Sequence, residues 1–148
     1  MDNLTWVLVA DSSKARLFGV RKAKLFNKAA DPNDLTFIDE YYHENSRKKD
    51  SDLVTDKLGG FGKGTFVEAT DPKHHEAELF SHKLTQVLSN GHSQNHYRDV
   101  ILVAPPAFMG LLNQHLSTEI DKLISLRIEK DYTEHNPKEL ITHLINYL

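Results

Sequence analysis

The chain has 148 residues, of which 39% are hydrophobic and 26% are charged, and its formal net charge is -3 at pH 7. This length fits one domain with a single sizeable core, and the composition is too apolar for a wholly disordered chain. The absence of cysteine excludes disulfides, thiolate zinc sites and a cysteine nucleophile, and it fits a reducing compartment.

No stretch of the sequence resembles a targeting or membrane segment. Residues 1–4 run directly into an apolar strand, which leaves no basic region and no cleavage site for a signal peptide. No apolar run approaches the ~18 to 20 residues that cross a bilayer. We therefore expect a cytoplasmic protein without a membrane span, and the sequence leaves its oligomeric state open.

The first part of the chain predicts three strands. "TWVLVA" at 5–10 is an apolar run, and "KARLFGV" at 14–20 follows it across a turn-like "DSS", which predicts a tight hairpin that bends at Asp11. "LTFIDEYYH" at 35–43 predicts the third strand. Hydrophobic density then falls from about 44 to 70, which predicts a long mobile loop.

The second part of the chain alternates helices with strands. A helix that begins at 70 or 71 and stops at Gly91 carries an apolar stripe, and "DVILVA" at 99–104 predicts a strand covered on both faces. A second helix covers about 106–116. "LRIEKDY" at 126–132 predicts a fifth strand, and a last helix begins at Asn136-Pro137.

The order of these elements is β-β-β-α-β-α-β-α. A strand meander followed by alternating helices and strands predicts the α/β class, with helices packed on a mixed sheet. This is the order of a ribonuclease-H-like fold. We expect a single domain over residues 1–148.

Three stretches of the chain carry a resemblance to a known family. They are "WVLVADSSKARLF" (6–18), "ILVAPPAFMGLL" (101–112) and "IEKDYTEHNPKELITHL" (128–144). Together they resemble the bacterial host attachment proteins, a family labelled as required for attachment to host cells. That label implies an attachment or surface-interaction factor.

The same element order is similar to the middle domain of archaeal and eukaryotic class-I translation release factors. In that domain an Asp-turn hairpin precedes a basic loop with Gly-Gly-Gln and a helix that opens with basic and His residues. The matching positions are Asp11, Gly59-Gly60 and Lys73-His74-His75. Phe61 stands where the motif has glutamine, which argues against peptidyl-tRNA hydrolysis by this motif. The resemblance implies contact with RNA, tRNA or the ribosome, and it gives His75 a role beside the loop.

The glycine-rich segment "DKLGGFGKGTF" at 56–66 has two interpretations. Its glycine spacing and polar flanks differ from a P-loop, so we do not expect a nucleoside triphosphate site. Lys57 and Lys63 can meet phosphates when a partner orders the segment. The alternative is a solvated loop whose neighbouring aspartates offset the positive charge.

Residues 14–28 hold six basic side chains and no acidic one. Strand alternation sends Lys14 and Arg16 to the same face, where they can follow an RNA backbone. Solvated charge that protects a strand edge explains the same residues equally well.

Asp11 is the weak candidate for catalysis. A carboxylate at this place helps to bind catalytic metal in ribonuclease-H-like nucleases, but the fourth strand ends in Ala104-Pro105-Pro106, without the further acid that two-metal chemistry needs. A turn residue that accepts hydrogen bonds from its own backbone is the other interpretation. We expect no metal site and no cofactor.

Three functional hypotheses follow from these patterns. The first is a non-catalytic RNA- or ribosome-associated domain that contacts phosphates through Lys14, Arg16, Lys57, Lys63 and the neighbouring Gly59, Gly60 and His75. The second is the attachment factor that the family label implies. The third is a metal-dependent hydrolase that uses Asp11.

Overall fold

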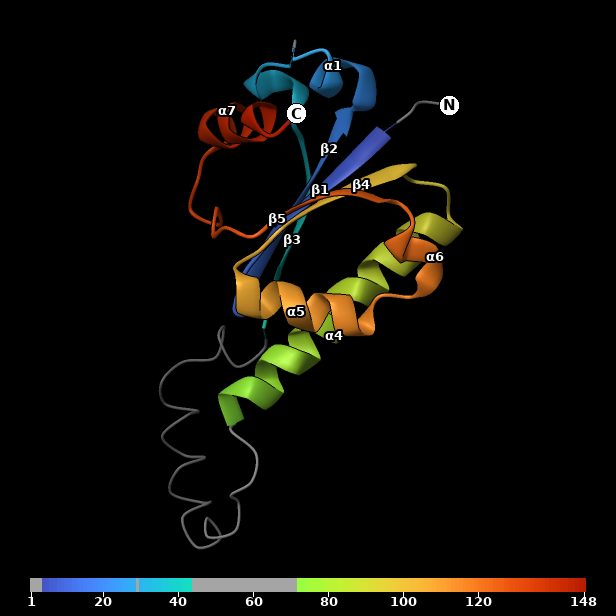
Figure 1. Ribbon diagram of the computed structural model, residues 1–148, viewed down its shortest axis with the longest axis vertical. Helices are drawn as coiled ribbons and strands as arrows, with labels where there is room; N and C mark the ends of the chain where they lie inside the picture. The colour runs from blue at the N-terminus through green and yellow to red at the C-terminus, as the bar shows by residue number, and fades with distance from the viewer. Residues whose placement is uncertain (1–3, 29, 44–71) are drawn as a thin grey trace, which may run out of the picture.

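The computed structural model describes residues 4–28, 30–43 and 72–148. These residues form a five-stranded sheet with helices on both faces (Figure 1). The predicted loop at 44–70 lies outside the described residues. The predicted α/β class with a mixed sheet is confirmed, and the ribonuclease-H-like assignment stays a prediction.

The sheet combines antiparallel and parallel neighbours in the order β3-β2-β1-β4-β5. β2 pairs antiparallel with β1 and β3, whereas β4 pairs parallel with β1 and β5. The strands are β1 (Leu4–Ala10), β2 (Lys14–Arg21), β3 (Thr36–Tyr42), β4 (Asp99–Val103) and β5 (Ile124–Ile128). Because β1, β4 and β5 run in the same direction, their carboxyl ends meet at one edge of the sheet.

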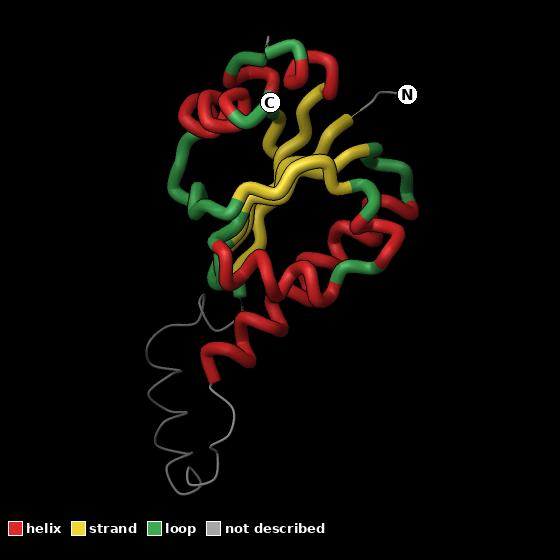
Figure 2. Tube along the Cα trace, in the orientation of Figure 1, coloured by secondary structure: helices red, strands yellow, loops and turns green. Residues whose placement is uncertain are grey.

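The helices form a layer on each side of the sheet (Figure 2). One layer contains α4 (Pro72–Ser93), α5 (Pro106–His115) and the short α6 (Thr118–Asp121). The other contains α1 (Lys22–Phe26), the 3-10 helix η1 (Pro32–Asp34) and α7 (Pro137–Asn146). β4 is buried at all five positions, as its continuous apolar sequence predicts for a strand covered on both faces.

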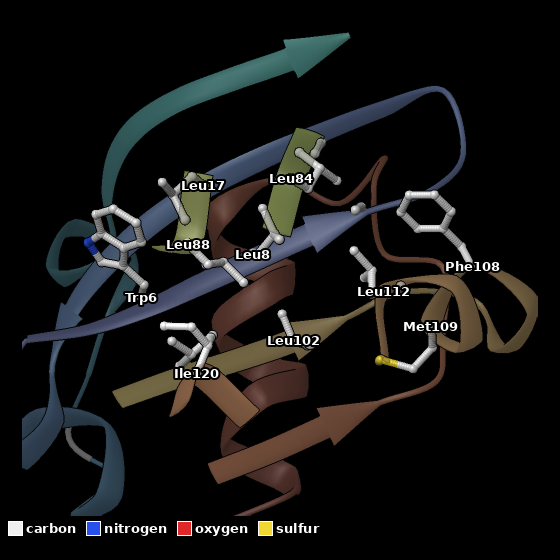
Figure 3. Packing of buried hydrophobic residues seen from close by; sticks show 14 of the residues in the cluster. Trp6, Leu8, Leu17, Leu84, Leu88, Leu102, Phe108, Met109, Leu112 and Ile120 are labelled. Carbon is white, nitrogen blue, oxygen red and sulfur yellow. The ribbon is translucent and has the colours of Figure 1, made fainter. Parts of the chain in front are cut away.

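Strand alternation divides the core into two clusters. Trp6, Leu8 and Leu17 point toward the α4–α5 layer, where Leu84 and Leu88 pack against them (Figure 3). The intervening strand residues pack against α7 in a second cluster, whose main members are Val7, Val9, Phe18, Ile101, Leu140 and Leu144. Each side of the sheet is therefore anchored by its own helix layer.

The start of α7 is encoded locally. The Asn136 side chain accepts a hydrogen bond from the Glu139 N–H, and the Glu139 side chain accepts one from the Asn136 N–H. Pro137 occupies the first helical turn. This capping box satisfies donors that a helix end leaves unpaired, so the predicted start at Asn136-Pro137 is confirmed.

Two predicted boundaries are wrong. The fifth strand ends at Ile128 instead of residue 132, because the polar residues that follow leave the sheet. α4 continues past Gly91 to Ser93. Gly91 is not a stop signal: a Cβ atom there would lie 2.4 Å from Trp6 Cη2, so the helix needs glycine to approach this ring.

Tyr97 links the end of α4 to the sheet and gives the protein an alkaline sensitivity. Its hydroxyl donates to the Leu88 carbonyl oxygen at 2.6 Å, and burial, with a smaller contribution from Glu119, raises the pKa of Tyr97 above its ordinary value of 10.0. The folded state therefore holds this proton more tightly than the unfolded state. The stability that this group contributes is complete below about pH 10 and is lost as the pH rises further.

Chemical denaturation of the wild type and of Tyr97→Phe at pH 8 and above pH 10 measures this effect. We expect Tyr97→Phe to be less stable at pH 8, because the hydrogen bond to Leu88 is lost, and to show a smaller alkaline decrease. Equal pH dependence in the two proteins would contradict the assignment.

Among the helices in the described part of the chain, none combines the length and the apolar character that crossing a membrane requires.

Candidate functional site

A cleft of about 550 Å³ opens where the carboxyl ends of the parallel strands meet. We call it the carboxyl-edge cleft. The β1–β2 turn (Asp11–Ser13) contributes one wall, and the start of α4 contributes Lys73 and His74. Pro105 and Phe108 line it from the start of α5. Ligands of open parallel sheets bind outside this edge, so the cleft is the candidate functional site.

Asp11 builds the turn at this edge. Its Oδ1 accepts hydrogen bonds from the N–H groups of Ser13 (2.7 Å) and Lys14 (2.9 Å). Its Oδ2 lies 3.2 Å from the Thr133 hydroxyl oxygen. Asp11 is thus a turn residue that bonds its own backbone, which is the second of the two sequence interpretations, and its carboxylate also lines the cleft.

A second carboxylate, Asp131, reaches the cleft from the segment after β5. Its Oδ1 accepts hydrogen bonds from the Thr133 hydroxyl at 2.6 Å and from the Thr133 N–H at 3.1 Å. The buried Thr133 side chain therefore lies between Asp11 and Asp131. No group of three or more His, Asp or Glu side chains within the described ranges is placed to hold a metal ion.

Arg16 holds the segment that carries these groups. Its Nη2 donates to the carbonyl oxygens of Tyr132 (3.2 Å), Thr133 (2.8 Å) and His135 (2.8 Å). Burial lowers the pKa of the Arg16 guanidinium, and the ring of Phe18 lies 5.4 Å from its carbon Cζ. Arg16 thereby ties the backbone between β5 and α7 to β2.

Lys14 and a stack of aromatic rings also hold the segment between β5 and α7. Lys14 Nζ donates to Glu134 Oε2, and this hydrogen bond is the main cause that raises the pKa of Lys14. The Tyr132 ring stacks on His135 and on His143 of α7, with ring centroids 4.8 and 4.6 Å apart. The 132–135 segment is therefore tied to both the sheet and α7.

The predicted phosphate-binding residues fall in three places. Lys14 and Arg16 share one face of β2, as alternation predicts, and both contact the 132–135 segment. His75 is exposed and its neighbour His74 lines the cleft. Lys57, Gly59, Gly60 and Lys63 lie outside the described residues.

Sequence reasoning missed Asp131 and Thr133 as members of the site, and it named His74 only as part of the helix opening. Extension of the fifth strand to residue 132 placed Asp131 inside a strand, whereas the strand ends at Ile128. The change from "LRI" to the polar "EKD" was the available signal, because a carboxylate just beyond a parallel strand lies at the same edge as Asp11.

Both described ends of the stretch 44–71 lie at this edge. The His43 N–H donates to the Ser13 carbonyl oxygen at 2.9 Å, and Tyr42 pairs with Lys14 in the sheet. On the other side of the stretch, α4 begins at Pro72 and brings Lys73 to the cleft. The chain therefore leaves and re-enters the described structure beside the β1–β2 turn.

The sequence matches the family described as "Protein required for attachment to host cells" over residues 6–144. The chain belongs to this family. The comparison with curated proteins found no match.

Among solved structures, the fold is similar to an archaeal translation termination factor, aRF1, with a TM-score of 0.54 and 9% sequence identity. The match covers 99% of this chain and 35% of the termination factor. The chain thus spans about a third of that protein's length, and at this identity the likeness concerns the fold alone. The resemblance to the attachment family and to a release-factor fold is confirmed.

Proposed function

We propose that this member of the host attachment family is a cytoplasmic, non-catalytic binding domain that associates with RNA or the ribosome. The observation that carries the proposal is the arrangement at the carboxyl-edge cleft. The two ends of the stretch with the glycine segment, the Asp11 turn and the cationic start of α4 all meet there. The release-factor-like fold supports a role in translation.

The proposed contacts combine the glycine segment with the start of α4. Lys57, Gly59, Gly60 and Lys63 are assigned from the sequence, and His75 lies on the first turn of α4. The cleft adds Lys73 and His74. Cationic side chains and glycine backbone N–H groups contact phosphates without reading base sequence, which suits a domain that recognises backbone and shape.

Lys14 and Arg16 contribute to this function through the 132–135 segment. Their donors bond Glu134 and three main-chain carbonyl oxygens, so binding phosphate through them would break these contacts. We assign Arg16 to the placement of Asp131 and Thr133 beside Asp11. Lys14 lies beside the Asp11 turn, where its ammonium group bonds Glu134 and holds the other side of the same segment.

The hydrogen bonds of the Asp11 carboxylate favour the binding hypothesis over the hydrolase hypothesis. Its Oδ1 is occupied by two turn N–H groups at 2.7 and 2.9 Å. Among the described residues that line the cleft, only Asp11 and Asp131 carry carboxylates, whereas two-metal chemistry needs several that converge on the ions. The hydrolase hypothesis therefore ranks below the binding hypothesis.

Co-sedimentation with ribosomes, purified from cells that produce the protein, tests the proposal across a range of salt concentrations. We expect the bound fraction to decrease as salt increases, and Lys57→Ala/Lys63→Ala to bind more weakly. With two phosphate contacts removed, the slope of log affinity against log salt should fall by about 1.4 for a single-stranded site. Lys83→Ala/Lys122→Ala removes the same charge from exposed positions outside the cleft and should sediment like the wild type.

The second candidate function is attachment or surface interaction, and the family description favours it. Fractionation of the producing cells separates the two candidates. Native protein on the cell surface, with no ribosome-associated fraction, would reject the RNA hypothesis and support the attachment hypothesis.

A further inference from the structure

The two carboxylates of the carboxyl-edge cleft keep acceptor capacity that the protein does not use. Asp131 Oδ2 accepts no hydrogen bond from the described residues. The Thr133 hydroxyl has one proton and lies 2.6 Å from Asp131 Oδ1 but 3.2 Å from Asp11 Oδ2, so it serves Asp131. Each carboxylate thus offers one oxygen to a ligand in the cleft.

These acceptors are held in place before a ligand arrives. Two N–H groups of the turn orient the Asp11 carboxylate, and Thr133 orients Asp131 through its hydroxyl and its N–H. Thr133 is fixed in turn by the hydrogen bond from Arg16 to its carbonyl oxygen. Acceptors that are already ordered avoid an entropy cost when the ligand binds.

The walls of the cleft favour different chemical groups of a ligand. Asp11 and Asp131 accept hydrogen bonds from hydroxyl groups and repel phosphate. Lys73, at the start of α4, attracts an anion to which the His74 ring can donate a hydrogen bond, whereas Pro105 and Leu111 of the α5 wall offer apolar surface. A matching ligand carries neighbouring hydroxyl groups, one anionic group and a flat, weakly polar body.

We propose that the carboxyl-edge cleft binds the 3′-terminal nucleotide of a single RNA strand, and this inference rests on the proposed function. The 2′- and 3′-hydroxyl groups of the terminal ribose donate to Asp11 and Asp131. The phosphate of the same nucleotide meets Lys73 and His74, and the base lies along the α5 wall. The volume of about 550 Å³ suits one nucleotide and excludes a duplex.

The requirement for a terminus follows from the charge of the two aspartates. Inside a strand the 3′-oxygen carries a phosphodiester, which removes one donor and places a negative charge beside Asp11 and Asp131. Only the last nucleotide of RNA presents both hydroxyl groups, and DNA lacks the 2′-hydroxyl. The site therefore distinguishes the end of an RNA strand from its interior and from DNA.

Fluorescence anisotropy with one short unpaired RNA, labelled at its 5′ end, tests the inference. The RNA is made with a 2′,3′-diol, with a 2′,3′-dideoxy end and with a 3′-phosphate. We expect the diol to bind at least tenfold more tightly than the other two ends, since each loses hydrogen bonds to a charged acceptor. The Asp131→Asn variant should lose most of this preference.

Matched variants exclude a general charge effect. Glu129→Gln changes the charge by the same amount as Asp131→Asn at a nearby exposed position outside the cleft, and it should keep the preference for the diol. Lys73→Ala should weaken all three RNAs, whereas Lys83→Ala, later on the same helix, should weaken none. An unfolding transition like that of the wild type shows that each variant is folded.

The outcomes separate this inference from the proposed function. Equal affinity for the three RNA ends overturns the inference and leaves RNA binding in place. If the three RNAs fail to bind, titration with adenosine 5′-monophosphate decides: binding that Asp131→Asn abolishes supports the cleft and rejects the wider RNA surface. The nucleotide site is rejected if adenosine 5′-monophosphate does not bind either. It is also rejected if a simple diamine binds the cleft in place of the nucleotide.

Discussion

Replacing Gly91 with alanine is expected to lower the free energy of unfolding by about 2 to 3 kcal/mol. The added methyl group would lie 2.4 Å from Trp6 Cη2 and 2.6 Å from Trp6 Cζ3, well inside van der Waals contact. Trp6 is buried and its ring packs on Tyr97 with centroids 4.6 Å apart, so the indole has little room to move. The end of α4 must therefore shift away from the sheet.

Gly110 of α5 supplies the control for this experiment. No atom lies within 4 Å of a Cβ added there, so Gly110→Ala should raise stability by up to about 1 kcal/mol through helix propensity. Urea denaturation of both variants measures the two effects with opposite signs. A Gly91→Ala protein as stable as the wild type would show that α4 does not depend on this close approach.

The Arg16→Met variant should lose about 2 to 4 kcal/mol of stability. The substitution removes a charged donor from the carbonyl oxygens of Tyr132, Thr133 and His135, and a buried acceptor without a partner costs about 1 to 3 kcal/mol. Methionine keeps the apolar stem that packs in the sheet. The loss therefore measures the hydrogen bonds more than the packing.

A second consequence of the Arg16→Met substitution is local. Amide hydrogen exchange should increase most in the 131–135 segment, and the preference of the cleft for a 2′,3′-diol should decrease because Asp131 is no longer held. Arg21→Met, at the exposed far end of the same strand, should change stability by less than about 0.5 kcal/mol. Uniform exchange throughout the sheet would contradict a positioning role for Arg16.

Short-range patterns predicted most elements correctly. Continuous apolar residues identified β4, and the Asn136-Pro137 pair identified the start of α7, because the burial of a strand and the cap of a helix depend on residues close in sequence. The Asp11 turn belongs to the same group, since its hydrogen bonds reach only Ser13 and Lys14.

The errors arose where a residue serves a distant partner. Gly91 has the sequence signature of a helix stop, but glycine is needed there because the Trp6 ring of β1 lies so close. Alternation extends the fifth strand through Asp131 because this pattern does not show where backbone pairing ends. Pairing of β5 with β4 ends at Val103–Ile128, and that limit belongs to the sheet.

The basic run at 14–28 shows the same limit for function. In the sequence it is one cationic segment, whereas β2 separates Lys14 from Arg21 by about 23 Å at 3.3 Å per residue. Lys14 and Arg16 at the cleft end contact residues 132–135, which no local pattern connects to them.

By itself, the sequence of this protein determined its strands, most of its helix starts and the turn at Asp11, since each depends on neighbours a few residues apart. Only the tertiary structure decided which charges have partners within the chain and which face the cleft. Lys14 and Glu134 are 120 positions apart, and Thr133 and Asp11 are 122 apart. Contacts over such separations form only when the sheet brings the carboxyl ends of β1 and β5 to one edge, so local physical rules cannot specify them.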